Sequence, residues 1–213
     1  AVGFLFNEAV INTRGEIASL TICKQNTLVD LWLNRSVEKP SIWQRTSGCT
    51  GGVTAATRGI PSSLTDAPAE VSPLTVITGM DQMLQAQAMY REAGGLHCSA
   101  LSDGETIRYM AEDIGRHNTL DKLAGLMQMD DARFIPRIIF TTGRVSSDML
   151  QKSARMGAFL VASRTTPTSL SIKFAQKLGI TLVGYVRRDH FTVYAHPERF
   201  TGVDSPIVSD AAE

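Results

Sequence analysis

Hydrophobic and polar residues alternate over residues 14–33, and this period of two predicts two strands separated by a turn at residues 24–26. Cys23 lies within the alternation, so we expect it to pack in the core. Residues 44–73 have no hydrophobic periodicity and are rich in Thr, Ser, Gly and Pro, which predicts a long mobile loop. This loop contains Cys49.

A helical period replaces the alternation from Thr78 onward. It predicts a helix to Glu92 that ends at Gly94 and Gly95, followed by a second helix from about His97. Strands and helices then alternate. Three strands, each followed by a helix, are predicted at residues 106–110, 137–140 and 158–162, and two more strands at 180–186 and 191–194. This order is typical of an α/β sheet that is largely parallel in its middle.

Composition and charge exclude several classes of protein. Of the 213 residues, 43% are hydrophobic and 20% charged, and 21 basic residues balance 21 acidic ones, which gives no electrostatic footprint for bulk nucleic-acid binding. No apolar run approaches the roughly 20 residues needed to span a bilayer, and residues 1–10 lack the pattern of a secretory signal peptide. Three widely spaced cysteines do not form a disulfide framework, so we expect a reducing cytoplasm.

The three predicted strand-to-helix junctions are rich in Gly, Ser, Thr and Arg, and each contains one arginine: Arg116, Arg144 and Arg164. The carboxyl ends of parallel strands meet at one edge of a sheet, where open α/β sheets bind ligands. Helix N-termini and guanidinium groups there favour a phosphate-bearing ligand, to which His117 is a candidate contact. The alternative is that the Ser and Thr residues only cap helices. Neither GxGxxG nor GxxxxGK[ST] is present, so a standard dinucleotide or P-loop site is not expected.

Cys49 is the candidate reactive thiol. It lies in RTSGCTGG, where glycines leave the side chain accessible and Arg45 and Arg58 are near enough in sequence to lower its pKa. Cys98, at the start of the predicted second helix, is assigned to packing. The pair His97 and Cys98 lacks the glutamate and the CxxC of zinc deaminases, so no metal site is predicted.

Several long segments, in order, resemble the formate dehydrogenase accessory sulfurtransferase family, FdhD. They are residues 94–101, 112–125, 141–157 and 163–188, and residues 1–10 and 45–52 fit the same family. The resemblance implies a cytidine-deaminase-like fold without its zinc chemistry: a three-layer sheet with helices on both faces, plus a small N-terminal β region. We expect residues 1–73 to form that region with the cysteine loop, and 74–213 to form the α/β domain. The resemblance also implies a homodimer and a further stretch of chain before Ala1.

The resemblance further implies a function. Such proteins accept sulfur as a persulfide from a cysteine desulfurase and pass it to the molybdenum bis(molybdopterin guanine dinucleotide) cofactor, which then enters formate dehydrogenase. The family's carrier cysteine falls on Cys49. Its guanine dinucleotide contact falls on Tyr185, Val186, Arg187, Arg188, Asp189 and His190. Many members carry CxxC in the loop, but Gly52 replaces the second cysteine here. This excludes a mechanism that needs a disulfide between those two cysteines, and a single persulfide carrier is chemically sufficient.

The sequence is therefore consistent with three functions. The first is a cytoplasmic sulfurtransferase that uses Cys49, binds the cofactor as a substrate and needs no metal of its own. The second is a non-catalytic chaperone that binds and escorts the cofactor. The third is a nucleotide-sensing regulatory module.

Overall fold

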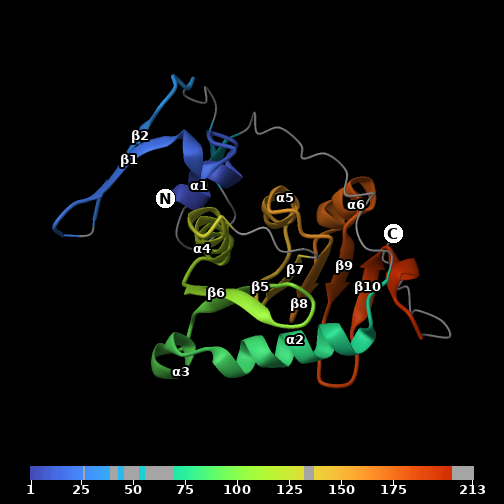
Figure 1. The fold of residues 1–213 in the computed structure, drawn as a ribbon. Coiled ribbons are helices and arrows are strands. Elements are labelled where there is room, and N and C mark those ends of the chain that lie inside the picture. The colour runs from blue at the N-terminus through green and yellow to red at the C-terminus, as the bar shows by residue number, and fades with distance from the viewer. Residues whose placement is uncertain (26, 39–42, 46–52, 56–69, 132–136, 203–213) are drawn as a thin grey trace.

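A six-stranded mixed sheet lies between two layers of helices in the computed structural model of the chain (Figure 1). The structure describes residues 1–25, 27–38, 43–45, 53–55, 70–131 and 137–202. The strand order is β10-β9-β8-β7-β5-β6. The strands are β5 (His97–Ser102), β6 (Ile107–Asp113), β7 (Ile138–Thr141), β8 (Leu160–Ser163), β9 (Thr181–Gly184) and β10 (Thr192–Ala195).

The middle of this sheet is parallel, as predicted. Strands β7, β8 and β9 run in one direction, β10 pairs antiparallel with β9, and β5 pairs antiparallel with both β7 and β6. All four residues of β7, β8 and β9 are buried. Strands covered on both faces form nearly continuous apolar runs, which explains why their sequences were recognisable.

Helices cover both faces of the sheet (Figure 1). On one face lie α4 (Arg116–Met129), α5 (Ser147–Arg155) and α6 (Ser169–Leu178), and on the other lies α2 (Pro73–Ala86), continued by α3 (Met89–Ala93). Each face has its own apolar core: Ile139 of β7 packs in the core under α4 and α5, whereas Phe140 packs in the core under α2. The three-layer arrangement predicted for the chain is confirmed.

The N-terminal part combines a hairpin with a helix. Strands β1 (Ile17–Ile22) and β2 (Val29–Leu33) pair antiparallel, which confirms the two strands predicted there. The hairpin extends away from the body of the molecule in Figure 1. Helix α1 (Val2–Asn7), which the sequence analysis did not predict, packs on α4. Gly3 makes this close contact possible, because a Cβ there would overlap the backbone of Asp121 and Gly125.

The predicted loop at 44–73 is wrong in part. It overlaps β3 (Trp43–Arg45) and contains β4 (Val53–Ala55), and these two strands pair antiparallel. Strands of three residues are too short to give a periodic signal, so composition alone dominated the prediction.

The helix predicted from Thr78 begins five residues earlier. Ser72 caps it by accepting a hydrogen bond from the Leu74 amide at 3.2 Å, and Pro73 occupies the first helical position, where proline is favoured. The helix ends at Ala86. Glu112 stabilises the start of α3, because its carboxylate accepts hydrogen bonds from the amides of residues 88, 89 and 90.

The helix predicted from about His97 is wrong, because this segment is strand β5. Its residues from Cys98 to Ser102 are all buried. A short apolar run fits a buried helix and a buried strand equally well, and the choice depends on its neighbours. Here β6 and β7, both later in the chain, supply hydrogen-bonding partners on the two sides.

Candidate functional site

The three strand-to-helix junctions lie at one edge of the sheet, as predicted. Strands β6 and β7 are both antiparallel to β5, so β6, β7 and β8 all end at the same edge. The end of β9 lies there too, and His97, the first residue of β5, lies between the ends of β7 and β6. The topology therefore places Arg116, Arg144 and Arg164 along one edge.

Hydrogen bonds join the junctions after β7 and β8. The Ser163 hydroxyl donates to the carbonyl of Gly143 at 2.8 Å, and the Arg164 amide donates to the carbonyl of Thr141 at 3.0 Å. Val145 and Pro167 form an isolated parallel bridge. The junctions after β7 and β8 are thus one connected structure.

The segment after β9 is fixed onto the junction after β8. The amides of Tyr185 and Val186 donate to the carbonyls of Thr165 and Ser163, each at 3.0 Å. In return, Arg164 donates to the carbonyl of Val186 at 3.0 Å and Arg187 to the carbonyl of Arg164 at 2.7 Å. Arg164 and the segment that begins at Tyr185 are therefore in direct contact.

This end of the edge is strongly basic. Burial, followed by the positive charges of Arg187 and Arg188, holds the pKa of Arg164 below its usual range. The neighbouring guanidinium groups repel one another, so an anion that bridges them would remove an unfavourable interaction. Asp189 lies in the same segment, but its carboxylate contacts His190 at 2.8 Å, and both side chains are largely exposed.

Tyr185 has an unusual backbone for an aromatic residue. Its φ is 52°, in the left-handed region that bulky residues rarely adopt. The side chain is 42% exposed, and the Arg187 guanidinium carbon lies 6.0 Å from its ring centroid. Such strained positions cluster at functional sites, and an exposed ring beside a cation can stack against a nucleobase.

At the other end of the edge, Arg116 and His97 lie close to Gly143. A Cβ at Gly143 would lie 2.9 Å from the Cβ of Arg116 and 3.5 Å from Nδ1 of His97. Burial, followed by the positive charge of Arg116, lowers the pKa of His97. His97 was not among the predicted site residues, because the helix assigned to its segment hid its place at the edge.

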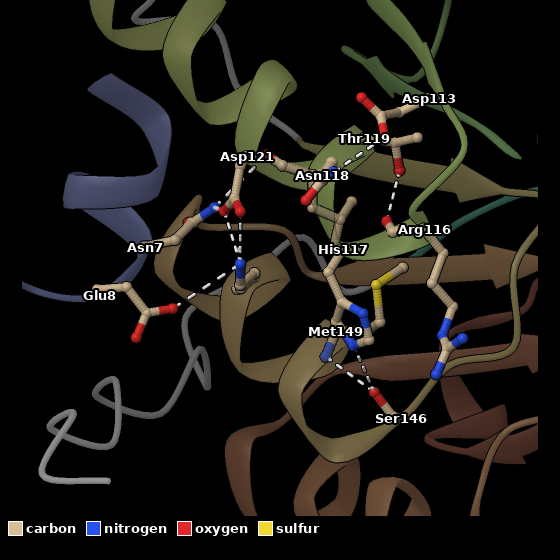
Figure 2. A network of polar contacts seen from close by, with 12 residues as sticks. Asn7, Glu8, Asp113, Arg116, His117, Asn118, Thr119, Asp121, Ser146 and Met149 are labelled. Atoms are coloured by element: carbon tan, nitrogen blue, oxygen red, sulfur yellow. Dashed lines mark hydrogen bonds and ion pairs between the residues drawn. The ribbon is translucent and has the colours of Figure 1, made fainter. Parts of the chain in front are cut away.

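His117 has a structural contact. It is buried, and its Nε2 lies 3.3 Å from the Ser146 hydroxyl, which itself accepts the amide of Met149 at the start of α5 (Figure 2). The side chain therefore links α4 to α5, and its contact with a ligand stays a prediction.

Helix capping accounts for part of the hydroxyl pattern. Ser146 caps α5 and Thr168 caps α6, in a capping box with Ser171. These residues fit the alternative that the sequence left open. Arg144, by contrast, is exposed at the edge, so helix capping does not explain it.

The structure bears differently on the predicted roles of Cys49 and Cys98. Cys49 lies outside the described residues, so its role stays a prediction. Cys98 is buried in β5, and burial, followed by the negative charge of Glu112, raises its pKa to about 12, which agrees with a packing role. Among the described residues, no group of three or more His, Cys, Asp and Glu side chains is arranged to hold a metal ion.

Cys23 is not a core residue, contrary to the sequence prediction. It follows β1 and is partly exposed. Its sulfur lies 3.6 Å from the Thr27 hydroxyl and accepts the amide of Leu28 at 3.2 Å. These contacts lower the pKa of Cys23 to about 7, and the hydrogen bond with Thr27 has the largest effect. Alternation placed Cys23 in a strand, but it lies between β1 and β2 in a hairpin that extends away from the body of the molecule (Figure 1).

A buried ion cluster under the site was also not predicted. The Lys152 ammonium on α5 lies 2.7 Å from both carboxylate oxygens of Asp121 on α4 and 3.8 Å from that of Glu8. Asn7 donates to Asp121 at 2.7 Å, so residues at the end of α1 join the cluster (Figure 2). Lysine at one position of a helix gives no sequence signal of burial.

Comparisons with known proteins agree on one family. The model of the FdhD/NarQ family matches residues 1–201. Proteins named sulfur carrier protein FdhD from the Staphylococcus aureus strains bovine RF122 / ET3-1 and JH9 are each 32% identical over 209 residues, which cover 93% of this chain and 77% of theirs. A crystal structure described as a formate dehydrogenase accessory protein from Desulfotalea psychrophila superimposes with a TM-score of 0.72 at 26% identity, over 93% of this chain and 77% of that one.

Proposed function

This chain belongs to the FdhD/NarQ family, whose relatives are named as sulfur carriers, and on that premise we propose the reaction that it performs. Cys49 accepts sulfur as a persulfide from a cysteine desulfurase and passes it to the molybdenum bis(molybdopterin guanine dinucleotide) cofactor. The cofactor is the substrate of this step and then enters formate dehydrogenase. The resemblance of the sequence to the family also supports a cytoplasmic homodimer.

One observation carries the binding half of the proposal: the basic edge formed by Arg164, Arg187 and Arg188 beside the exposed ring of Tyr185. A guanine dinucleotide carries phosphates and flat bases. Guanidinium groups bind phosphate through charge-assisted hydrogen bonds, and aromatic rings stack on bases. The edge supplies both kinds of group within one connected segment.

The sulfur-transfer half needs only one thiol. The Cys49 thiolate attacks the outer sulfur of the desulfurase persulfide, a new S–S bond forms at Cys49, and the desulfurase cysteine leaves as a thiolate. Delivery of the outer sulfur breaks the S–S bond, and Cys49 returns to the thiolate. The sulfur leaves at the sulfur(0) level, so the cofactor in its reduced form supplies the two electrons that make it a sulfide ligand. Because Gly52 stands in place of the second cysteine of CxxC, no disulfide between two cysteines of this loop competes with this cycle.

Intact mass after incubation with a cysteine desulfurase and cysteine tests the carrier. We expect the chain to gain one sulfur atom, and Cys49→Ala to gain none. Cys98→Ala and Cys23→Ala are matched controls that should still gain sulfur. Uptake by Cys49→Ala, or its loss in a well-folded Cys98→Ala protein, would contradict a single carrier at Cys49.

The chaperone alternative shares the basic edge and lacks the sulfur step. It predicts that the wild-type chain binds guanosine diphosphate but gains no sulfur from a desulfurase. It also predicts that Cys49→Ala supports formate dehydrogenase activity as well as the wild type does. Sulfur uptake at Cys49 together with inactive formate dehydrogenase in Cys49→Ala would exclude it.

The binding step is tested by calorimetry with guanosine diphosphate. Arg164→Ala should weaken affinity about tenfold or more, because a hydrogen bond to a charged group contributes roughly 1.5–3 kcal/mol and 1.4 kcal/mol is tenfold. Arg144→Ala tests whether the exposed arginine contributes. Unchanged affinity in both variants would mean that these junctions are only helix ends.

A further inference from the structure

His97 is the first residue of β5, and it lies at the edge of the sheet where the neighbouring strands end. Strand β5 is antiparallel to both of its neighbours, so its first residue lies where β7 and β6 end. Among the described residues, this arrangement brings the imidazole of His97 next to Arg116, the first residue of α4, and next to Gly143, which follows β7. The three residues come from three separate parts of the chain.

Gly143 leaves room between the two side chains. The position that its Cβ would take is 2.9 Å from the Cβ of Arg116 and 3.5 Å from Nδ1 of His97. A contact of 2.9 Å between two such carbons is closer than real ones, so any larger residue at 143 would displace Arg116, whereas 3.5 Å to His97 is an ordinary contact. Glycine therefore keeps a guanidinium-bearing residue and an imidazole side by side.

The imidazole is half-buried and has unused hydrogen-bonding capacity. No hydrogen bond joins either ring nitrogen of His97 to another residue in the described part of the chain. Burial and the charge of Arg116 favour the neutral ring, which has one N–H donor and one acceptor. Half-buried polar groups without a protein partner are costly unless water or a ligand satisfies them.

We propose that His97 is a ligand-binding residue of the edge and that its ring N–H donates to a phosphate group held beside Arg116. The inference rests on the proposed function, which supplies a ligand with several phosphates. His97 lies three strand positions from β9, roughly 14 Å along the edge at about 4.8 Å per strand. It therefore serves a different phosphate from the one near Arg164 and Arg187.

The experiment follows the histidine rings by NMR during titration with inorganic pyrophosphate and then with guanosine diphosphate. Pyrophosphate has no base, so it tests this end of the edge independently of Tyr185. The sequence contains only four histidines. His196 is the internal control, because it lies at the opposite edge, where its carbonyl accepts the hydroxyl of Thr181 at the start of β9.

We expect the ring signals of His97 to move saturably with both ligands while those of His196 stay fixed. His97→Ala should weaken pyrophosphate binding about tenfold, the effect of losing one hydrogen bond to a charged group. His97→Gln, which keeps a donor, should recover most of that loss. Titration of the wild-type chain keeps the test valid even if a variant folds poorly.

The outcomes separate this inference from the function on which it rests. If the wild type binds guanosine diphosphate but the His97 signals do not move and His97→Ala binds as well as wild type, His97 is not a binding residue and the proposed function stands. If the wild type binds neither guanosine diphosphate nor pyrophosphate, the proposed ligand itself is wrong, whatever the sulfur uptake at Cys49.

Discussion

At the scale of single residues, the surroundings of a thiol decide its reactivity. Cys23 follows strand β1 and Cys98 lies within strand β5, yet their thiols differ. The pKa of Cys23 is lowered to about 7, and that of Cys98 is raised to about 12. The hydroxyl of Thr27 and the amide of Leu28 contact the sulfur of Cys23 and stabilise the thiolate. Burial of Cys98 in β5 does the opposite.

Iodoacetamide labelling, followed by peptide mass spectrometry, measures this difference. Because the thiolate is the nucleophile, the labelling rate of Cys23 should rise with pH through a midpoint near 7. Cys98 should stay unlabelled in the folded chain up to at least pH 9. Thr27→Ala should move the midpoint for Cys23 upward, since Thr27 is the largest cause of the shift. Equal rates for the two thiols would contradict these assignments.

At the scale of elements, the buried cluster around Lys152 holds three helices together. Its ammonium lies between the carboxylates of Asp121 on α4 and Glu8 beside α1, and all three side chains are buried or nearly so. One turn away on α4, His117 contacts the cap of α5. The cluster therefore helps to fix how α4 and α5 present their N-termini at the edge of the sheet.

Lys152→Met tests the cluster by urea unfolding. The substitution leaves two carboxylates in the interior without their cation, which should cost about 3–5 kcal/mol of unfolding free energy. Lys122→Met is a matched control on the same face of the sheet, because Lys122 pairs with Asp113 at 2.7 Å but is about half exposed. An exposed pair contributes at most about 1 kcal/mol. Similar losses in the two variants would show that burial of Lys152 does not matter.

At the scale of the whole molecule, the hairpin and the sheet differ in how they are held. Strands β7, β8 and β9 are buried on both faces, whereas five of the six residues of β1 are exposed. Within the described part of the chain, strands β1 and β2 pair only with each other, and the hairpin extends away from the body (Figure 1). Local opening is favoured where few apolar contacts are lost.

Hydrogen exchange followed by mass spectrometry compares the two parts. Amides of β1 and β2 should exchange at least about tenfold faster than those of β8, since a difference of 1.4 kcal/mol in opening free energy is already tenfold. Peptides from β7 serve as the reference for opening of the central sheet. Equal protection of β1 and β8 would mean that the hairpin opens only when the whole chain unfolds.

Local patterns in the sequence determined much of this protein. The buried runs of β7, β8 and β9, with a helix after each of the first two, were recognisable because an apolar strand bounded by turn residues is a local signal. That order also places Arg144 and Arg164 at one edge, since parallel strands joined by helices end on the same side. The segments quoted from the chain were likewise enough to indicate the family, which the comparisons confirm.

Other features were decided only by tertiary structure, because they depend on contacts between residues far apart in the chain. Residues 97–102 became a strand because β6 and β7 pair with it, and this pairing alone brought His97 beside Arg116. Lys152 is buried because Glu8 and Asp121 neutralise it, and Cys23 is partly exposed because it lies between the strands of a hairpin that extends away from the body. Sequence periodicity reports which face of an element is apolar, whereas the partner that covers that face is fixed only when the chain folds.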